Sequence, residues 1–396
     1  MRYACVWIPG LGDLMKEQLK FAGSVFRMGT LGAKALVSSA VRALQPKPPM
    51  VEVPCEPIVL MHGFAGFQEI KVGNWILLEY FNGVRRLLGA MGYPVFAPAV
   101  ALFDDPLDRA KQWRTAIDKI RFATGAKKVH LVGHSQGGLD ARVLVAPKGP
   151  PQETPLGKLH GFGYGPNVAS LTTIATPHLG SALANELNQE VPAHQEALDA
   201  LLDLVSDIAQ LITGSPQDVK RAVRALSRDF MIDYFNRIIE DDPDVPCYAV
   251  AGDPVTADFV QPMLLAFHLA INEIEPALGG GPNDGLVAVT SSLFGNFSAD
   301  YEEQARAELD ANRRPHWKTL GVVKADHIAE VGIPLWFQAR DAYDQLPFFA
   351  GLAQFLDTEY TAEMKLRNDG RWERRPKPGP LPVTVAANTA GSTQAL

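Results

Sequence analysis

Residues 127–146 read KKVHLVGHSQGGLDARVLVA: an apolar run, VHLV, meets three glycines around one serine and then a helix-like segment. Glycine weakens both strands and helices, so three glycines at such a junction need another explanation. The spacing Gly133-His134-Ser135-Gln136-Gly137 is typical of a very sharp strand-to-helix turn, which needs small residues two positions either side of an exposed serine. The stretch therefore predicts that Ser135 is a nucleophile between a buried strand and the N-terminus of a helix.

A serine hydroxyl is a poor nucleophile at neutral pH, so the site also needs a base that takes its proton and an acid that orients the base. With this type of turn, the acid and then a histidine follow the serine along the chain. His316 and His327 both come late enough to be the base, and we favour His327, in KADHIAEVG. Asp284, in the glycine-rich turn GGGPNDGLVAV ahead of an expected apolar strand, is the predicted acid, with Asp253 in YAVAGDP as the alternative.

Two backbone N–H groups are expected to stabilise the oxyanion that forms when such a serine attacks a carbonyl group. One belongs to the residue after the nucleophile, here Gln136. The other is expected from Phe64, in the loop after the apolar run PIVLM, where Gly63 lets the backbone approach a substrate. We interpret His62 as a residue that orders this loop through a hydrogen bond rather than as a base.

Apolar runs that suit buried strands alternate with helical stretches from EPIVLMHG at residue 56 onward. Further runs of this kind are VFAPAVAL, VHLVGH, VASLTTIATP and CYAVAGD. Uninterrupted apolar strands separated by helices predict an α/β fold with a mainly parallel sheet flanked by helices. The residues from about 190 to 240 have a helical pattern of mixed polarity, and we expect them to form an inserted helical lid or cap.

The chain divides into three segments. Residues 51–366 are the predicted main domain, and the tail 367–396 is expected to be disordered because it has little apolar periodicity. Residues 1–50 form a basic arm, since no acidic side chain occurs from Leu19 to Val51 and the apolar residues fall near helical spacing. We expect an amphipathic helix there that lies on a membrane or lipid surface, or that packs on the domain.

The composition narrows the class of protein. Of 396 residues, 47% are hydrophobic and 20% charged, which indicates a soluble globular chain. The net charge of -7 argues against a nucleic-acid partner. Three cysteines, Cys5, Cys55 and Cys247, are too few for a disulfide scaffold and are expected to be buried or reduced thiols. Because no clear signal peptide is recognised, we expect a cytoplasmic or membrane-peripheral location, with secretion as the alternative.

Several segments resemble, in the same order, those of the bacterial triacylglycerol lipases, the secreted true lipases with an α/β-hydrolase fold. They cover roughly residues 56 to 335 and are PIVLMHGFAG, VHLVGHSQGGLDAR, VASLTTIATPHLGSALA, GPNDGLVAVTSSLFG and DHIAEV. The resemblance implies a serine carboxylic-ester hydrolase with nucleophile Ser135, acid Asp284 and base His327. It also implies oxyanion donors at Phe64 and Gln136.

A lipid ester is the substrate that this resemblance implies. Apolar residues of the expected lid would then line the acyl pocket: Val205, Ile208, Leu211 and Ile212. Three other functions stay open: an acyltransferase or a short-chain or polyester esterase, each with the same triad, and a lipid-binding module without catalysis.

The chain departs from the family pattern at a position that matters for a metal. Family members carry a calcium-binding aspartate two residues after the histidine, where this chain has Ala329. Calcium takes six to eight oxygen ligands, so the loss of a charged one weakens the site. We therefore predict no tightly bound calcium and no other cofactor. The family's lid-region disulfide has no counterpart either, since Cys247 has no evident partner.

Overall fold

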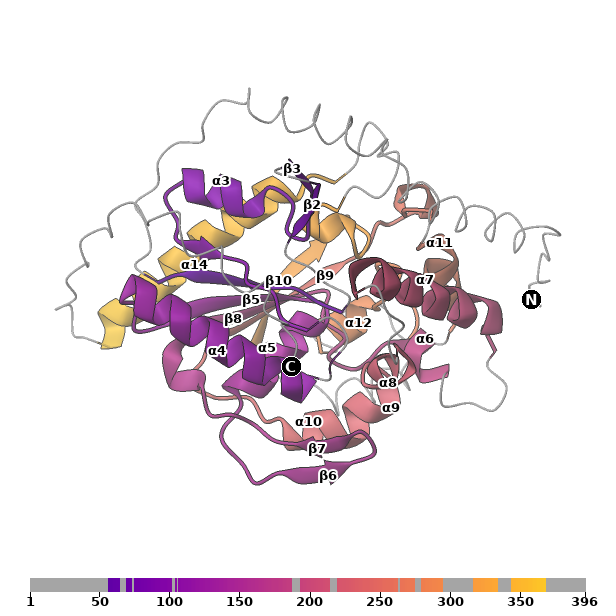
Figure 1. Ribbon diagram of the computed structural model, residues 1–396, viewed down its shortest axis with the longest axis horizontal. Coiled ribbons are helices and arrows are strands. Elements are labelled where there is room, and N and C mark those ends of the chain that lie inside the picture. The colour runs from indigo at the N-terminus through magenta and orange to yellow at the C-terminus, as the bar shows by residue number, and fades with distance from the viewer. Residues whose placement is uncertain are drawn as a thin grey trace, which may run out of the picture.

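The computed structural model forms a parallel β-sheet with helices on both faces (Figure 1). The residues it describes are 56–64, 69–72, 75–101, 104, 106–186, 193–213, 219–262, 264–274, 279–294, 316–333 and 343–367. The predicted arm, residues 1–50, and the tail from residue 368 onward lie outside these ranges. The predictions made for them stay predictions.

Six parallel strands make the main sheet, in the order β10-β9-β8-β5-β1-β4. They are β1 (Ile58–Met61), β4 (Val95–Phe96), β5 (Val129–His134), β8 (Val168–Ile174), β9 (Cys247–Gly252) and β10 (Trp317–Val323). Met61 lies opposite Gly133, and His134 lies opposite Ile174, so the carboxyl ends of β1, β5 and β8 meet at one edge. The predicted α/β fold with a parallel sheet is confirmed.

Alternate side chains of each buried strand face opposite layers of helices. The helices of these layers include α3 (Val84–Ala90), α4 (Pro106–Thr124), α5 (Gln136–Val145) and α14 (Gln345–Arg367). Val59 of β1 belongs to the apolar cluster of Trp113 on α4. Its neighbour Leu60 belongs to the cluster of Val84 on α3 and Phe349 on α14. Both faces of the sheet are thus covered, as Figure 1 shows.

Further helices, short and long, lie between β8 and β10 along the chain. Its members are α6 (Ala182–Asn185), α7 (Gln195–Thr213), α8 (Val219–Arg224), α9 (Arg228–Phe230), a π turn (Met231–Phe235), α10 (Asn236–Ile238), α11 (Leu265–Glu273) and α12 (Val289–Ser292). Leu198 of α7 and Phe267 of α11 share a buried apolar cluster, against which Phe64 packs. Helices α7 to α10 and the π turn occupy most of the described residues between 193 and 240, while the side chains of Val205, Ile208, Leu211 and Ile212 lie outside the described part.

Smaller elements complete the described chain. They are the hairpins β2 (Glu69–Val72) with β3 (Trp75–Glu79) and β6 (Gln152–Thr154) with β7 (Gly157–Leu159), and the 3-10 turns Gly165–Asn167, Ala257–Phe259 and Ala329–Val331. Cys247 at the start of β9 is buried and free, as predicted, and burial raises its pKa well above the usual value. Among the helices within the described ranges, none is both long and apolar enough to cross a membrane.

The apolar strand predicted after Asp284 is wrong. Residues 285 to 287 form bends, Ala288 makes an isolated antiparallel bridge to Asn283, and the short helix α12 follows. Asp284 Oδ1 accepts hydrogen bonds from the backbone N–H groups of Leu286 at 2.9 Å and Val287 at 2.8 Å. A side chain that binds its own backbone in this way competes with a strand ladder, so the segment turns.

Candidate active site

Ser135 stands at the turn between β5 and α5 with φ 55° and ψ −131°, a backbone conformation that side-chain-bearing residues rarely adopt. Two contacts with β8 and the loop after it hold it there. Its N–H donates to the carbonyl oxygen of Ile174 at 2.9 Å, and Thr176 Oγ1 donates to the Ser135 carbonyl oxygen at 2.9 Å. The sharp turn predicted from the sequence is therefore present. Strained backbone conformations of this kind occur most often at functional sites.

The glycines of the turn are explained by how closely other backbone approaches them. A Cβ atom on Gly133 would lie 2.6 Å from the backbone nitrogen of Gly138. On Gly137 it would collide with the carbonyl oxygens of Met61 and His62, in β1 and the loop after it. Distances under 3 Å do not occur for real Cβ atoms, so glycine is required at both positions.

His327 and Asp284, which are 43 residues apart, form a direct pair. His327 Nδ1 lies 2.8 Å from Asp284 Oδ2, and the two side chains are buried. A carboxylate accepts, so the ring proton is assigned to Nδ1, which leaves Nε2 as an acceptor. Because Asp284 Oδ1 is occupied by two backbone N–H groups, the carboxylate is held in one orientation. Asp253, the alternative acid, instead accepts the N–H of Val255 within its own turn.

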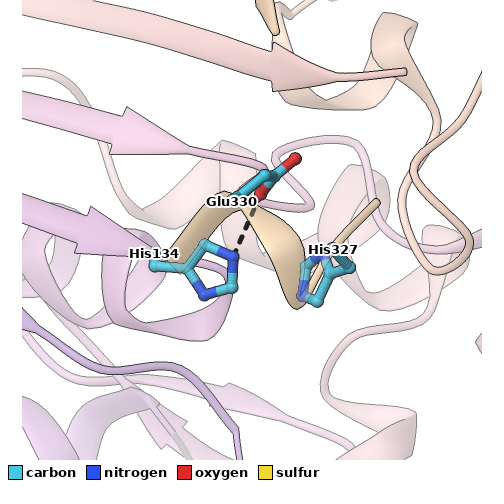
Figure 2. A group of neighbouring side chains, drawn as sticks. All are labelled: His134, His327 and Glu330. Carbon is cyan, nitrogen blue, oxygen red and sulfur yellow. Dashed lines mark hydrogen bonds and ion pairs between the residues drawn. The ribbon is translucent and has the colours of Figure 1, made fainter. Parts of the chain in front are cut away.

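A second buried pair ties the histidine turn to the serine turn. Glu330 comes from the same short turn as His327, and its Oε2 lies 3.1 Å from Nε2 of His134, the neighbour of Ser135 (Figure 2). The rings of His134 and His327 lie beside each other, with centroids 4.6 Å apart. His134 Nδ1 also bonds the hydroxyl of Tyr80 at 2.8 Å. His327 is thereby placed next to the turn that carries Ser135.

Burial favours the uncharged forms of this second pair. It lowers the pKa of His134 well below its usual value and raises the pKa of Glu330 well above its usual value. The nearby carboxylates of Asp284 and Asp326 raise the pKa of Glu330 further. Asp284 is the carboxylate that contacts His327 directly, whereas Glu330 bonds to His134 of the serine turn. The sequence offered no sign of Glu330 beyond a carboxylate among apolar neighbours in AEVG.

The loop of Gly63 and Phe64 lies against the serine turn. A Cβ atom on Gly63 would come within 2.6 Å of the Cβ of Ser135. His62 orders the loop, as predicted: its Nδ1 bonds the Gly63 carbonyl oxygen at 3.0 Å and its Nε2 accepts the N–H of Val100 at 3.1 Å. Burial, and next the charge of Arg109, lowers the pKa of His62 to about 3, which keeps the ring neutral.

Comparison with known proteins gives the family. A family model described as "Alpha/beta hydrolase family" matches residues 58–391. This chain is an α/β-hydrolase. It is 26% identical over 266 residues to a triacylglycerol lipase of Vibrio cholerae, which covers 62% of this chain and 76% of that one. It is 25% identical over 301 residues to triacylglycerol lipase 2 of Saccharomyces cerevisiae, which covers 66% of this chain and 82% of that one.

Solved structures agree with the fold of this α/β-hydrolase. The lipase of Staphylococcus hyicus superposes with a TM-score of 0.55 at 19% identity, over 81% of this chain and 100% of that one. Lipase 1 of Pelosinus fermentans gives a TM-score of 0.54 at 20% identity, over 77% of this chain and 99% of that one. The resemblance to bacterial triacylglycerol lipases is thus confirmed as distant homology.

One group in the described part of this α/β-hydrolase has ligand atoms close enough to hold a metal ion. His134, His327 and Glu330 bring theirs within 4.8 Å of one another. Hydrogen bonds already use these groups: both ring nitrogens of His134, Oε2 of Glu330 and Nδ1 of His327. These hydrogen bonds account for the proximity of the three side chains, and Glu330 Oε1 has no hydrogen-bond partner in the described structure. Next to it, the N–H of Ala329 donates to Asp326 Oδ1 at 2.9 Å.

Proposed function

We propose that this α/β-hydrolase is a serine carboxylic-ester hydrolase of the triacylglycerol lipase type. The observation that carries the proposal is the strained Ser135, with φ 55°, at the turn next to the hydrogen-bonded pair of Asp284 and His327. A serine held out of the ordinary backbone regions, beside a histidine whose Nδ1 is tied to a carboxylate, is the arrangement that acyl transfer through an acyl-enzyme needs.

In the proposed reaction, His327 Nε2 takes the proton of Ser135 as the hydroxyl oxygen attacks the ester carbonyl carbon. The N–H groups of Phe64 and Gln136 stabilise the oxyanion of the tetrahedral intermediate. Its collapse releases the alcohol, which takes the proton back from His327, and leaves an acyl group on Ser135. A water molecule, activated in the same way, then releases the acid. Asp284 orients the ring and stabilises its charged form without taking the proton.

A lipid ester is the proposed substrate class. The distant relatives named above are triacylglycerol lipases, and the buried apolar cluster of Leu198 and Phe267 reaches the loop of Phe64. We propose that α7, in the segment from about 190 to 240, is a lid whose Val205, Ile208, Leu211 and Ile212 contact the acyl chain. Exchange of two of these residues for polar ones is then expected to reduce long-chain hydrolysis more than short-chain hydrolysis.

Hydrolysis of p-nitrophenyl esters from C4 to C16 tests the proposal, with wild-type protein beside Ser135→Ala. We expect activity in the wild type, an optimum at long chains, and loss of turnover in the variant. Activity on short chains alone would make the protein an esterase. Activity that survives the substitution would overturn the assignment of Ser135. Product analysis with an added alcohol shows whether the acyl group passes to water or to the alcohol.

A further inference from the structure

Arg109, in the first turn of α4, is a fully buried cation next to the loop of Gly63 and Phe64. Burying a charge is costly unless it is paired and hydrogen-bonded. Its Nε donates to Asp140 Oδ2 at 2.7 Å, and Trp113 Nε1 donates to the same oxygen at 2.9 Å. Asp140 is itself fully buried on α5, the helix that begins after Ser135. The pair therefore fixes the guanidinium between the two helices.

The other end of the guanidinium binds backbone carbonyl oxygens. Nη2 donates to the carbonyl of His62 at 2.7 Å and to that of Gly63 at 3.2 Å, and Nη1 donates to that of Ala101 at 2.5 Å. The Gly63 carbonyl also bonds His62 Nδ1 at 3.0 Å. Because burial keeps the His62 ring neutral with Nε2 as an acceptor, Nδ1 is the donor. Two donors thus hold this one carbonyl.

That carbonyl and the N–H of Phe64 belong to the same peptide unit. A trans peptide is planar, and its C=O and N–H point in opposite directions. Holding the Gly63 carbonyl toward Arg109 therefore turns the Phe64 N–H away from α4. Glycine has little backbone preference of its own, and the Gly63 N–H, which donates to Tyr80 Oη at 3.1 Å, belongs to the preceding peptide unit. The direction of the Phe64 N–H is therefore set in part by the groups that hold the Gly63 carbonyl.

We infer that Arg109, held by Asp140 and assisted by His62, is a positioning residue of the oxyanion hole: it sets the direction of the Phe64 N–H. The inference rests on the proposed function. In this inference the guanidinium acts through the peptide between Gly63 and Phe64 and not by contact with the substrate. Its loss is expected to weaken transition-state stabilisation more than substrate binding.

The chain supplies a matched control in Arg142 on α5. This arginine is also buried, lies 3.6 Å from Asp241, and stacks over the rings of Phe235 at 5.1 Å and Phe294 at 4.8 Å. These partners belong to residues 235 to 294 and not to the loop of residues 62 to 64. Arg142→Lys therefore removes a buried guanidinium with a comparable cost in stability and leaves the proposed oxyanion hole alone.

The test compares Arg109→Lys with Arg142→Lys in p-nitrophenyl ester hydrolysis, together with the affinity of an alkyl boronic acid that mimics the tetrahedral intermediate. For Arg109→Lys we expect kcat to fall about 100-fold, as for the loss of one oxyanion donor, with KM within about 3-fold and boronate affinity reduced in parallel. Arg142→Lys is expected to lower the melting temperature similarly while kcat stays within about 3-fold.

Equal kcat values in the two variants, or an unchanged boronate affinity in Arg109→Lys, would overturn the inference. If Arg109→Lys does not fold, His62→Gln carries the same test with a smaller expected loss of about 10-fold in kcat, because it keeps an acceptor for the Val100 N–H and removes the Nδ1 donor to the Gly63 carbonyl. A wild-type protein without ester hydrolysis would refute the proposed function instead. The two failures are therefore distinguishable.

Discussion

The serine half and the histidine half of the site are held by different kinds of contact. Around Ser135, backbone lies directly on backbone, and Gly133 and Gly137 leave no room for even one methyl group. Around His327, side chains do the holding: Asp284 fixes the ring, and Glu330 bonds to the serine half. Close backbone packing tolerates no added atom, whereas a hydrogen-bonded side chain tolerates any replacement with the same shape and the same donors. The two halves should therefore respond to mutation in different ways.

The largest expected effect is on the acid of the histidine half. Asp284→Asn keeps the shape but permits the wrong ring tautomer of His327, so we expect kcat to fall by about 10⁴-fold. Asp253→Asn is the matched control and the alternative acid, and we expect it to stay near wild type because Asp253 bonds within its own turn. Steady-state kinetics on one ester measures both. A larger loss in Asp253→Asn would reverse the assignment.

Gly137→Ala should be the most damaging single methyl group in the serine half. The new Cβ would collide with the carbonyl oxygens of Met61 and His62, which are backbone atoms that cannot move aside. We expect a loss of about 3 kcal/mol in the free energy of unfolding, together with loss of activity. Gly149→Ala is the control, since nothing lies within 4 Å of that position. Urea unfolding of both proteins measures the difference in stability. A stable, active Gly137→Ala protein would contradict the account.

Acid should weaken the serine half through its neutral buried histidines. Burial lowers the pKa of His130 on β5 to about 3, and the pKa of His62 is also about 3. In the unfolded chain both values are about 6.5, so between these limits the unfolded chain binds more protons and stability falls as pH falls. For each histidine, the free energy of unfolding is expected to fall by about 2 kcal/mol as the pH falls from 6.5 to 5.

Above pH 6.5 these histidines are mostly neutral in the unfolded chain as well, so this cost in stability largely disappears. Urea unfolding at pH 7 and at pH 5 measures the change. The His130→Asn protein should lose less stability than wild type, by the amount expected for that one histidine. A variant with the same pH dependence as wild type would show that His130 is not buried in its neutral form.

Glu330→Gln should have the smallest effect. Burial raises the pKa of Glu330, so the group that meets His134 is a neutral carboxyl, and the glutamine amide can donate to the same ring nitrogen. We expect a loss of less than about 1 kcal/mol in the free energy of unfolding and a kcat within about 3-fold of the wild-type value. Glu330→Leu leaves a buried ring nitrogen without a partner and is expected to cost about 2 kcal/mol. If the glutamine variant were as damaged as the leucine variant, the pair would be ionic instead.

The same contrast explains how much of the site could be predicted from the sequence. The turn of Ser135 is local, so five consecutive residues sufficed to predict it and the strand and helix around it. Asp284 and His327 were predicted from their order along the chain, and the structure pairs them. The strand expected after Asp284 was wrong, because a side chain that bonds its own backbone leaves no mark in an apolar pattern.

The long-range polar contacts could not be predicted from the sequence. Arg109 and Asp140 are 31 residues apart, and Glu330 is 196 residues from His134. A charged residue in a helix is usually on a solvated face, and only the packing of α4 on α5 buries Arg109. The parallel sheet, by contrast, was predictable because its strands are apolar on both faces.

Covalent titration with a p-nitrophenyl alkylphosphonate tests the central claim most directly, since the serine oxygen displaces p-nitrophenolate and keeps the phosphonyl group. The account predicts one phosphonyl group per chain, on the peptide that contains Ser135, with activity lost in proportion. It also predicts that His327→Ala reacts far more slowly. Full inactivation with the label on another residue, or an equally fast reaction of Ser135→Ala, would contradict it.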